Sequence, residues 1–275
     1  MYSTLMVYLD SSTDNTGLLQ ITADLAERFD AGVLGVSAAR LGGVGSDVSE
    51  VAGGVIDMGP EELDDALEST RKSLLAILQP SERHFEWRSI VNPGRLEAAV
   101  IRHARSADLV IVAANYPGSL SQGTPYLNAG DLAMQAGRPL LIVPHSTAKL
   151  TARNILVAWK DTREARRAVS DALPLLQTAD RTIVVEIARK KAIAEAKGSV
   201  ADVVEWLKWH GVKATGMTVL EEGLNARQLD AISKAQGADL IVAGAYHHRR
   251  LRQWALGGVT RNLLLNGDLC TLVSH

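Results

Sequence analysis

"SADLVIVAANY" at residues 106–116 returns 131 positions later as "GADLIVAGAY" at residues 237–246, and this repeat decides the fold. Two further pairs of segments match in the same order: "TLMVYLDSS" (4–12) with "NILVAWKDT" (154–162), and "GRPLLIV" (137–143) with "GDLCTLV" (267–273). Because the matches are spread along each half, the repeating unit is a whole domain. The sequence therefore predicts an N-terminal domain over residues 1–149 and a C-terminal domain over residues 150–275.

Within each half, strand-like apolar runs alternate with segments of helical periodicity. The expected strands are 2–9, 33–39, 84–91, 108–114 and 139–143, then 154–159, 181–187, 212–219, 239–243 and 269–273. The expected helices are 17–30, 60–79, 94–105 and 130–137, then 162–178, 195–210, 224–236 and 257–266. This alternation predicts an α/β protein of two tandem Rossmann-like domains, each a five-stranded parallel sheet with helices on both faces. Ligands of such sheets bind beyond the carboxyl ends of the strands, here after the first and fourth strands of each half.

The composition is that of a globular protein without a membrane span. Hydrophobic residues make up 47% of the chain and aromatic residues only 4%, so small aliphatic side chains must build the core. No apolar run approaches the roughly 18 residues that cross a bilayer, and the N-terminus lacks the layout of a secretory signal. One cysteine, Cys270, excludes an internal disulfide framework, and we expect it to be a buried small hydrophobe. These features predict a cytoplasmic protein.

Charge is divided unevenly between the two halves. Residues 1–149 carry 18 acidic and 11 basic side chains, a net of −7, and residues 150–275 carry 13 and 18, a net of +5. An anion is therefore favoured by the second half. Nucleic acid is disfavoured as a partner, because the basic residues have no interleaved aromatics and form no recognised module.

The segment "LGGVGSDVSEVAGGVIDMG" (41–59) is rich in glycine and long for a connection inside a compact domain. Disorder is the favoured interpretation, and a mobile lid is the alternative.

The repeat and the segment after the fourth strand resemble the universal stress protein family in its tandem form. The resemblance covers nearly the whole chain and is most specific at "NILVAWKDTREARRAV", "ADLIVAGAY" and "LRQWALGGVTRNLL". It implies domains of the adenine nucleotide alpha hydrolase-like type. ATP-binding members carry two glycines three apart after strand four, nine further residues, and then Gly followed by Ser or Thr. Glycines let main-chain amides approach phosphates, and a helix N-terminus attracts negative charge.

In the second half this motif is partial. The resemblance places Gly244 at the first glycine position, His247 at the second, and Gly257 and Gly258 at the Gly-Ser/Thr pair. A hydroxyl returns at Thr260, a further hydroxyl position of the family.

The end of the first strand of this half supplies the remaining candidates. The family's nucleotide-contacting Asp is replaced by Lys160, which could pair with a phosphate directly. The adenine is expected against aliphatic residues such as Ala158.

The first half departs further from the ATP-binding pattern. It keeps Asp10 after its first strand, but Ala113 and Tyr116 stand at the two glycine positions. Pro117 and Pro125 stiffen the segment that would have to wrap phosphates. We therefore expect this domain to be a degenerate partner that binds no nucleotide.

Neither catalysis nor a metal site is predicted. The sequence has no nucleophile elbow, no Walker loop and no His-Glu-x-x-His motif. His247 and His248 are adjacent, so their side chains diverge in an extended loop, and no Cys or carboxylate supports them at ligand spacing.

The sequence thus predicts a non-enzymatic regulatory protein of the stress response that binds an adenine nucleotide, ATP, in its C-terminal domain. The alternative is a nucleotide-free interaction scaffold of the same fold. The fifth strands, "PLLIV" and "LCTLVSH", are short apolar edges that we expect to pair with each other within the chain. Association into a homodimer stays open.

Overall fold

The computed structural model describes residues 1–39, 60–78, 84–91, 96–114, 127–245 and 268–275. Its strands are β1 (Thr4–Tyr8), β2 (Gly32–Ala39), β3 (Phe85–Val91), β4 (Leu109–Ala113), β5 (Leu140–Val143), β6 (Asn154–Ala158), β7 (Arg181–Ala188), β8 (Ala214–Leu220), β9 (Leu240–Gly244) and β10 (Cys270–Ser274). Its helices are α1 (Thr16–Phe29), α2 (Pro60–Leu78), α3 (Leu96–Ala104), α4 (Ala129–Gln135), α5 (Arg163–Asp171), α6 (Leu173–Thr178), α7 (Ile193–Trp209) and α8 (Asn225–Ala235), with a 3-10 turn at Lys190–Ala192. The expected segment 41–59 and the expected helix 257–266 lie outside the described residues.

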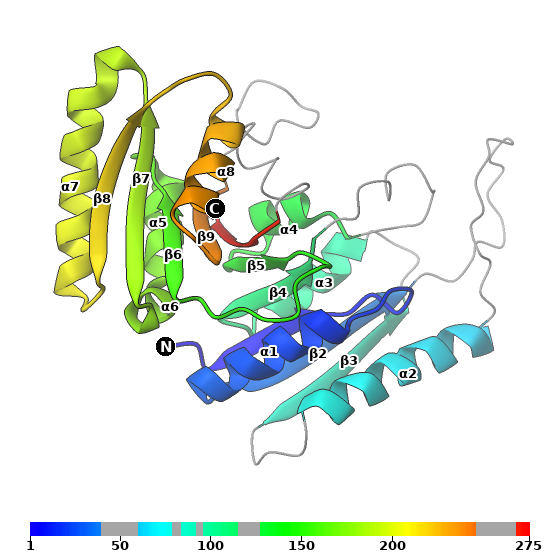
Figure 1. The fold of residues 1–275 in the computed structure, drawn as a ribbon. Coiled ribbons are helices and arrows are strands. Elements are labelled where there is room, and N and C mark those ends of the chain that lie inside the picture. Colours follow the sequence, from blue (N-terminus) through cyan, green and yellow to red (C-terminus); the bar gives the residue numbers. More distant parts are fainter. Residues whose placement is uncertain (40–59, 79–83, 92–95, 115–126, 246–267) are drawn as a thin grey trace, which may run out of the picture.

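The ten strands of the described ranges form one sheet, in the order β3-β2-β1-β4-β5-β10-β9-β6-β7-β8 (Figure 1). Each half contributes a parallel set with the same internal order. At the centre, β5 and β10 pair antiparallel, with Leu141 opposite Leu272. The two fifth strands are therefore neighbours, and neither is an edge of the sheet.

The core consists of two layers, one on each face of the sheet. Helices α1, α2, α5, α6 and α7 cover the first layer, and α3, α4 and α8 cover the second. Strands buried on both faces are apolar throughout, as "LVIVA" in β4 illustrates. Both layers contain residues of both halves, so the apolar core is continuous across the centre of the sheet. The predicted α/β class, with helices on both faces of a mainly parallel sheet, is confirmed.

One predicted helix is divided. The sequence predicts a single helix over 162–178, but α5 ends at Asp171 and α6 begins at Leu173. Pro174 lies in the first turn of α6, where its missing N–H costs no hydrogen bond. Within a continuous helix its ring would clash with the carbonyl of Ser170, and this explains the break.

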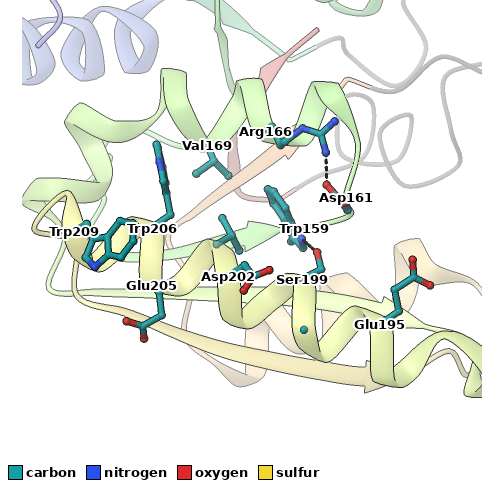
Figure 2. Close-up of a pocket in the computed structure, with 12 residues that line it drawn as sticks. Trp159, Asp161, Arg166, Val169, Glu195, Ser199, Asp202, Glu205, Trp206 and Trp209 are labelled. Carbon is teal, nitrogen blue, oxygen red and sulfur yellow. Dashed lines mark hydrogen bonds and ion pairs between the residues drawn. The ribbon is translucent and has the colours of Figure 1, made fainter.

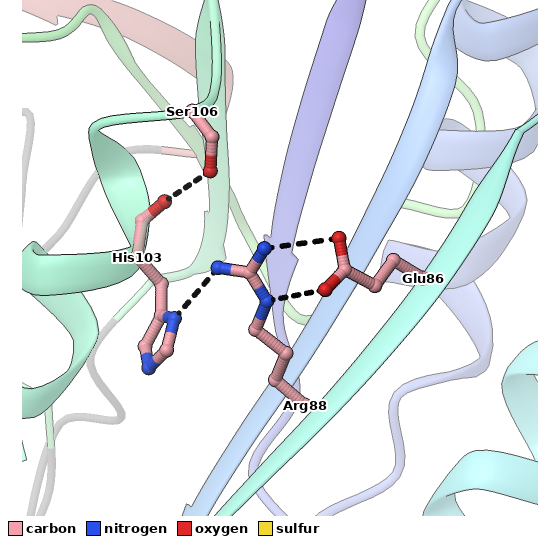
Figure 3. Close-up of polar contacts among 4 residues, drawn as sticks. All are labelled: Glu86, Arg88, His103 and Ser106. Atoms are coloured by element: carbon pink, nitrogen blue, oxygen red, sulfur yellow. Dashed lines mark hydrogen bonds and ion pairs between the residues drawn. The ribbon is translucent and has the colours of Figure 1, made fainter.

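The edge strand β3 carries charged side chains, which discourage pairing with another chain. Arg88 donates Nε and Nη2 to the two oxygens of Glu86, at 2.8 and 2.9 Å, and lies 2.9 Å through Nη1 from Nδ1 of His103 on α3 (Figure 3). Ser106 closes the end of α3 by donating to the His103 carbonyl. This cluster ties the edge strand to the helix beside it.

Across the described ranges, none of the helices combines the length and the apolar character that crossing a membrane requires.

Candidate functional site

The carboxyl ends of β6 and β9 form a topological switch point. From β6 the chain proceeds outward to β7 and β8, then returns to β9 on the other side of β6. Connections leave these two strands in opposite directions, and ligands of α/β sheets bind in the crevice that results. The register places Ala158 of β6 beside Ala243 of β9, directly before Gly244. Three candidate residues, Ala158, Lys160 and Gly244, therefore lie at one place.

These residues are at least partly accessible at the switch point, and Gly244 is half-buried. Ala158 is half-buried and packs against the second core layer, whereas Trp159 turns into the first layer. Lys160 is exposed and stands just before α5. Thr162 caps that helix, because its side chain accepts a hydrogen bond from the Ala165 N–H at 3.3 Å.

Gly244 has a structural explanation. A Cβ at this position would lie 2.6 Å from the Ala165 nitrogen and 2.7 Å from the carbonyl carbon of Glu164. The first turn of α5 thus rests directly on the backbone of β9, and only glycine permits that approach. The conformation gives Gly244 a packing role whether or not a ligand binds.

Glu186 on β7 is a neighbour that the sequence reasoning missed. One of its carboxylate oxygens is buried without a hydrogen-bond partner among the described residues. Burial raises the pKa of Glu186, Lys160 opposes that rise, and Asp161 and Glu195 reinforce it. The signal was a single carboxylate inside the apolar run "RTIVVEIA".

The remaining candidates, His247, Gly257, Gly258 and Thr260, lie outside the described residues, as does His248. Of the predicted site, the structure therefore describes Ala158, Lys160 and Gly244, which lie together at the ends of β6 and β9. Elsewhere in the described ranges, no group of three or more His, Cys, Asp or Glu side chains could hold a metal ion. Cys270 is buried, as predicted, and burial raises the pKa of its thiol to about 12.

The corresponding point of the first half is filled. Tyr8 ends β1 as Ala158 ends β6, and its ring is buried in the second core layer. Its hydroxyl donates to the Ala38 carbonyl at 3.4 Å, and burial raises its pKa. Asp10 stands where the second half has Lys160, and it accepts hydrogen bonds from the N–H and hydroxyl of Ser12. A buried phenol ring thus stands at the position where the second half has the half-buried methyl group of Ala158.

Comparison with solved structures identifies the fold. A universal stress protein from Archaeoglobus fulgidus superposes with a TM-score of 0.71 at 11% identity, over 98% of this chain and 97% of that one. A putative universal stress protein from Pseudomonas aeruginosa UCBPP-PA14 reaches 0.61 at 14% identity, over 99% and 93%. A functionally unknown protein from Pseudomonas aeruginosa PAO1 also reaches 0.61 at 14%, over 99% and 92%. No family model and no curated protein matches the sequence.

This protein therefore has the α/β fold of universal stress proteins, as the resemblance implies, over nearly its entire length.

Proposed function

We propose that this protein is a cytoplasmic regulatory protein of the stress response that binds an adenine nucleotide, ATP, with little or no turnover. Binding takes place in the C-terminal domain, residues 150–275. The N-terminal domain, residues 1–149, is a degenerate partner that binds no nucleotide.

The difference between Ala158 and Tyr8 carries this proposal. The two residues end equivalent strands at equivalent switch points, but the Tyr8 ring is buried in the second core layer whereas the small Ala158 is only half-buried. Adenine is flat and largely apolar, so it suits the half-buried surface beside Ala158. Lys160 adds a cation next to that surface, in the half of the chain with net positive charge.

The triphosphate is assigned from the sequence motif. Main-chain amides around Gly244, Gly257 and Gly258 hold the phosphates, and Thr260 and Lys160 assist. Glu186 points to the opposite face of the sheet from Ala158, since its neighbour Val185 packs in the second core layer. It is linked to this arrangement by its electrostatic interaction with Lys160.

The first test exchanges the distinguishing residue between the halves. Ala158→Tyr should abolish binding of ATP in isothermal titration, because the ring occupies the adenine surface as Tyr8 does in the first half. The variant should keep the parent's circular dichroism, since the fold already accepts tyrosine at the equivalent position. Lys160→Ala should weaken binding about tenfold through loss of a charged phosphate contact.

The matched control is Tyr8→Phe, which keeps the ring and should leave ATP binding unchanged. Mass spectrometry of nucleotide carried through purification provides a second measurement. Absence of heat at millimolar ATP, together with absence of any co-purified nucleotide, would contradict the proposal.

A nucleotide-free scaffold is the second candidate, and the packing of α5 on Gly244 favours it. That contact explains the glycine without a ligand. The double variant His247→Gly with Gly258→Ser restores the family pattern. Binding by this variant but not by the parent would establish the scaffold.

A further inference from the structure

A cavity lies between α5 and α7, on the opposite face of the sheet from Ala158. It has a volume of about 880 Å³, within the range of small-molecule sites. Trp159, directly after β6, and Val169 of α5 contribute to its wall, and one stripe of α7 forms the other side (Figure 2). That stripe extends from Glu195 to Trp209, about 21 Å along the helix axis.

The equivalent position in the first half is nearly closed. Helices α1 and α2 pack against each other there, and the remaining cavity measures about 190 Å³. Its lining is largely hydroxyl-bearing, with Ser69, Thr70 and Ser73 on α2. The size and aromatic lining of the cavity between α5 and α7 therefore do not follow from the fold itself.

Three tryptophans supply that aromatic lining. Trp159 is fixed in place, since its Nε1 donates to the Ser199 hydroxyl at 2.7 Å. Trp206 packs against His210, with the ring centroids 4.1 Å apart and the ring planes tilted by 37°. Trp209 is 83% exposed, although burial of an indole side chain removes a large apolar area from water and would stabilise the fold. An indole left this exposed beside a cavity is suited to contact with a ligand.

Gly198 adds open space on the same stripe. Glycine inside a helix costs about 1 kcal/mol relative to alanine. A Cβ at Gly198 would meet nothing within 4 Å, so packing within the protein does not require the missing side chain. Its absence widens the cavity beside Ser199.

The charges of the cavity select a cation. Four carboxylates line it, against one guanidinium. Asp161 bonds to Arg166, and Glu205 to Lys208 outside the lining. The other two, Glu195 and Asp202, form no hydrogen bond or ion pair within the described part of the chain. They lie two helical turns apart, about 10 Å along α7.

We propose that this cavity between α5 and α7 binds a linear aliphatic polyamine. The terminal ammonium groups pair with Glu195 and Asp202, and the methylene chain crosses the part of the cavity between them that Trp159 and Ser199 line, where apolar contact adds to the charge pairing. A triamine with nine bonds between its end nitrogens spans about 11 Å, which matches the two carboxylates. A compact cation reaches only one of them, and an anion is repelled by both.

Spermidine is the probe for this site, with binding followed by tryptophan fluorescence and isothermal titration at low salt. Saturable binding is expected, weakening as salt rises. Asp202→Asn and Glu195→Gln should each raise the dissociation constant about fivefold to tenfold, because each removes one ammonium partner. Gly198→Leu should weaken binding at least about tenfold by placing a side chain between Glu195 and Asp202, while leucine's better helix propensity maintains the fold.

The control variant is Asp65→Asn, which removes an exposed carboxylate from α2, the corresponding helix of the first half. It should bind spermidine as the parent does. The proposal is overturned if Mg²⁺ or a diol of the same length produces the same response, or if Gly198→Leu binds unchanged. ATP binding by Ala158→Tyr is measured separately, so failure at one site is distinguishable from failure at the other.

Discussion

At the scale of single residues, His103 makes stability depend on pH. Burial lowers the pKa of His103, and Arg88, Arg105 and Arg102 lower it further, against a smaller opposing effect of Glu86. Its Nδ1 faces the Arg88 guanidinium, a permanent donor, so the contact requires a neutral imidazole. A histidine whose pKa is lower in the folded state than in the unfolded state stabilises the fold at pH values above its ordinary pKa of 6.5. That contribution is lost as the pH falls through the lowered pKa.

Urea denaturation at pH 7.5 and pH 5.0 measures this effect. The parent should lose stability on acidification by less than about 1 kcal/mol through this group, because water screens a partly exposed pair. The His103→Gln variant keeps a side-chain oxygen that accepts a hydrogen bond from Arg88 and does not titrate. This variant should therefore lose less stability than the parent between pH 7.5 and pH 5.0. Equal losses in the two proteins would show that His103 is not the titrating group.

The sequence could predict where along the chain a site residue lies, but not to which face of the sheet its side chain points. The ends of the first and fourth apolar runs gave the place, since the ends of parallel strands meet at one edge of a sheet, and the family resemblance then singled out Lys160 and Gly244 there. The role of Tyr8 could not be predicted that way. Whether a strand-end side chain fills the switch point depends on which face it points to, and a one-residue change of register reverses the face.

At the scale of elements, two glycines associated with α7 should respond oppositely to the same substitution. A Cβ at Gly216 of β8 would lie 2.6 Å from Cγ1 of Val200, so Gly216→Ala pushes the helix from the sheet. Overpacking of this kind costs about 1–3 kcal/mol. Gly198→Ala meets open space and should stabilise the helix by up to about 1 kcal/mol.

Thermal unfolding followed by circular dichroism at 222 nm gives both values in one assay. The contrast is internally controlled, because the two sites share one helix and one chemical change. A loss of stability in both variants would mean that α7 tolerates neither change and that the space at Gly198 is not free.

Helices and strands were predictable where the periodicity of apolar residues determines them. They were less predictable where packing against neighbouring elements determines them. The apolar runs located the strands, whereas the break between α5 and α6 needed weight on Pro174, a signal present in "DALPLLQ". The cavity between α5 and α7 had no such signal. It depends on how closely two helices approach, and that distance is set by side chains from several elements.

At the scale of the whole molecule, the two halves are aligned with different offsets. β1 and β6 are 150 positions apart, but β4 and β9 are 131 apart. The sequence repeat detected both matches, so the common architecture was accessible without coordinates. The sequence did not predict that the connection between the halves is buried, because Leu150 and Ala152 lie in a short segment with no periodicity.

Those contacts predict that the halves separate only on unfolding. Leu150 and Ala152 are buried, Arg28 donates to the Leu150 carbonyl at 3.3 Å, and Tyr2 donates to the Asp171 carbonyl at 2.7 Å. With β5 on β10, they form a central contact resembling the core of one domain.

A protease site inserted between the exposed residues Ala148 and Lys149 tests this coupling. After cleavage the two fragments should co-elute in gel filtration and dissociate in urea only within the single transition that unfolds both. Leu141→Ala should lower the midpoint of that transition by removing about 2–5 kcal/mol of packing beside Leu272. Two stable fragments that separate without denaturant would show that each half folds alone, with the strand pairing at the centre contributing little to either.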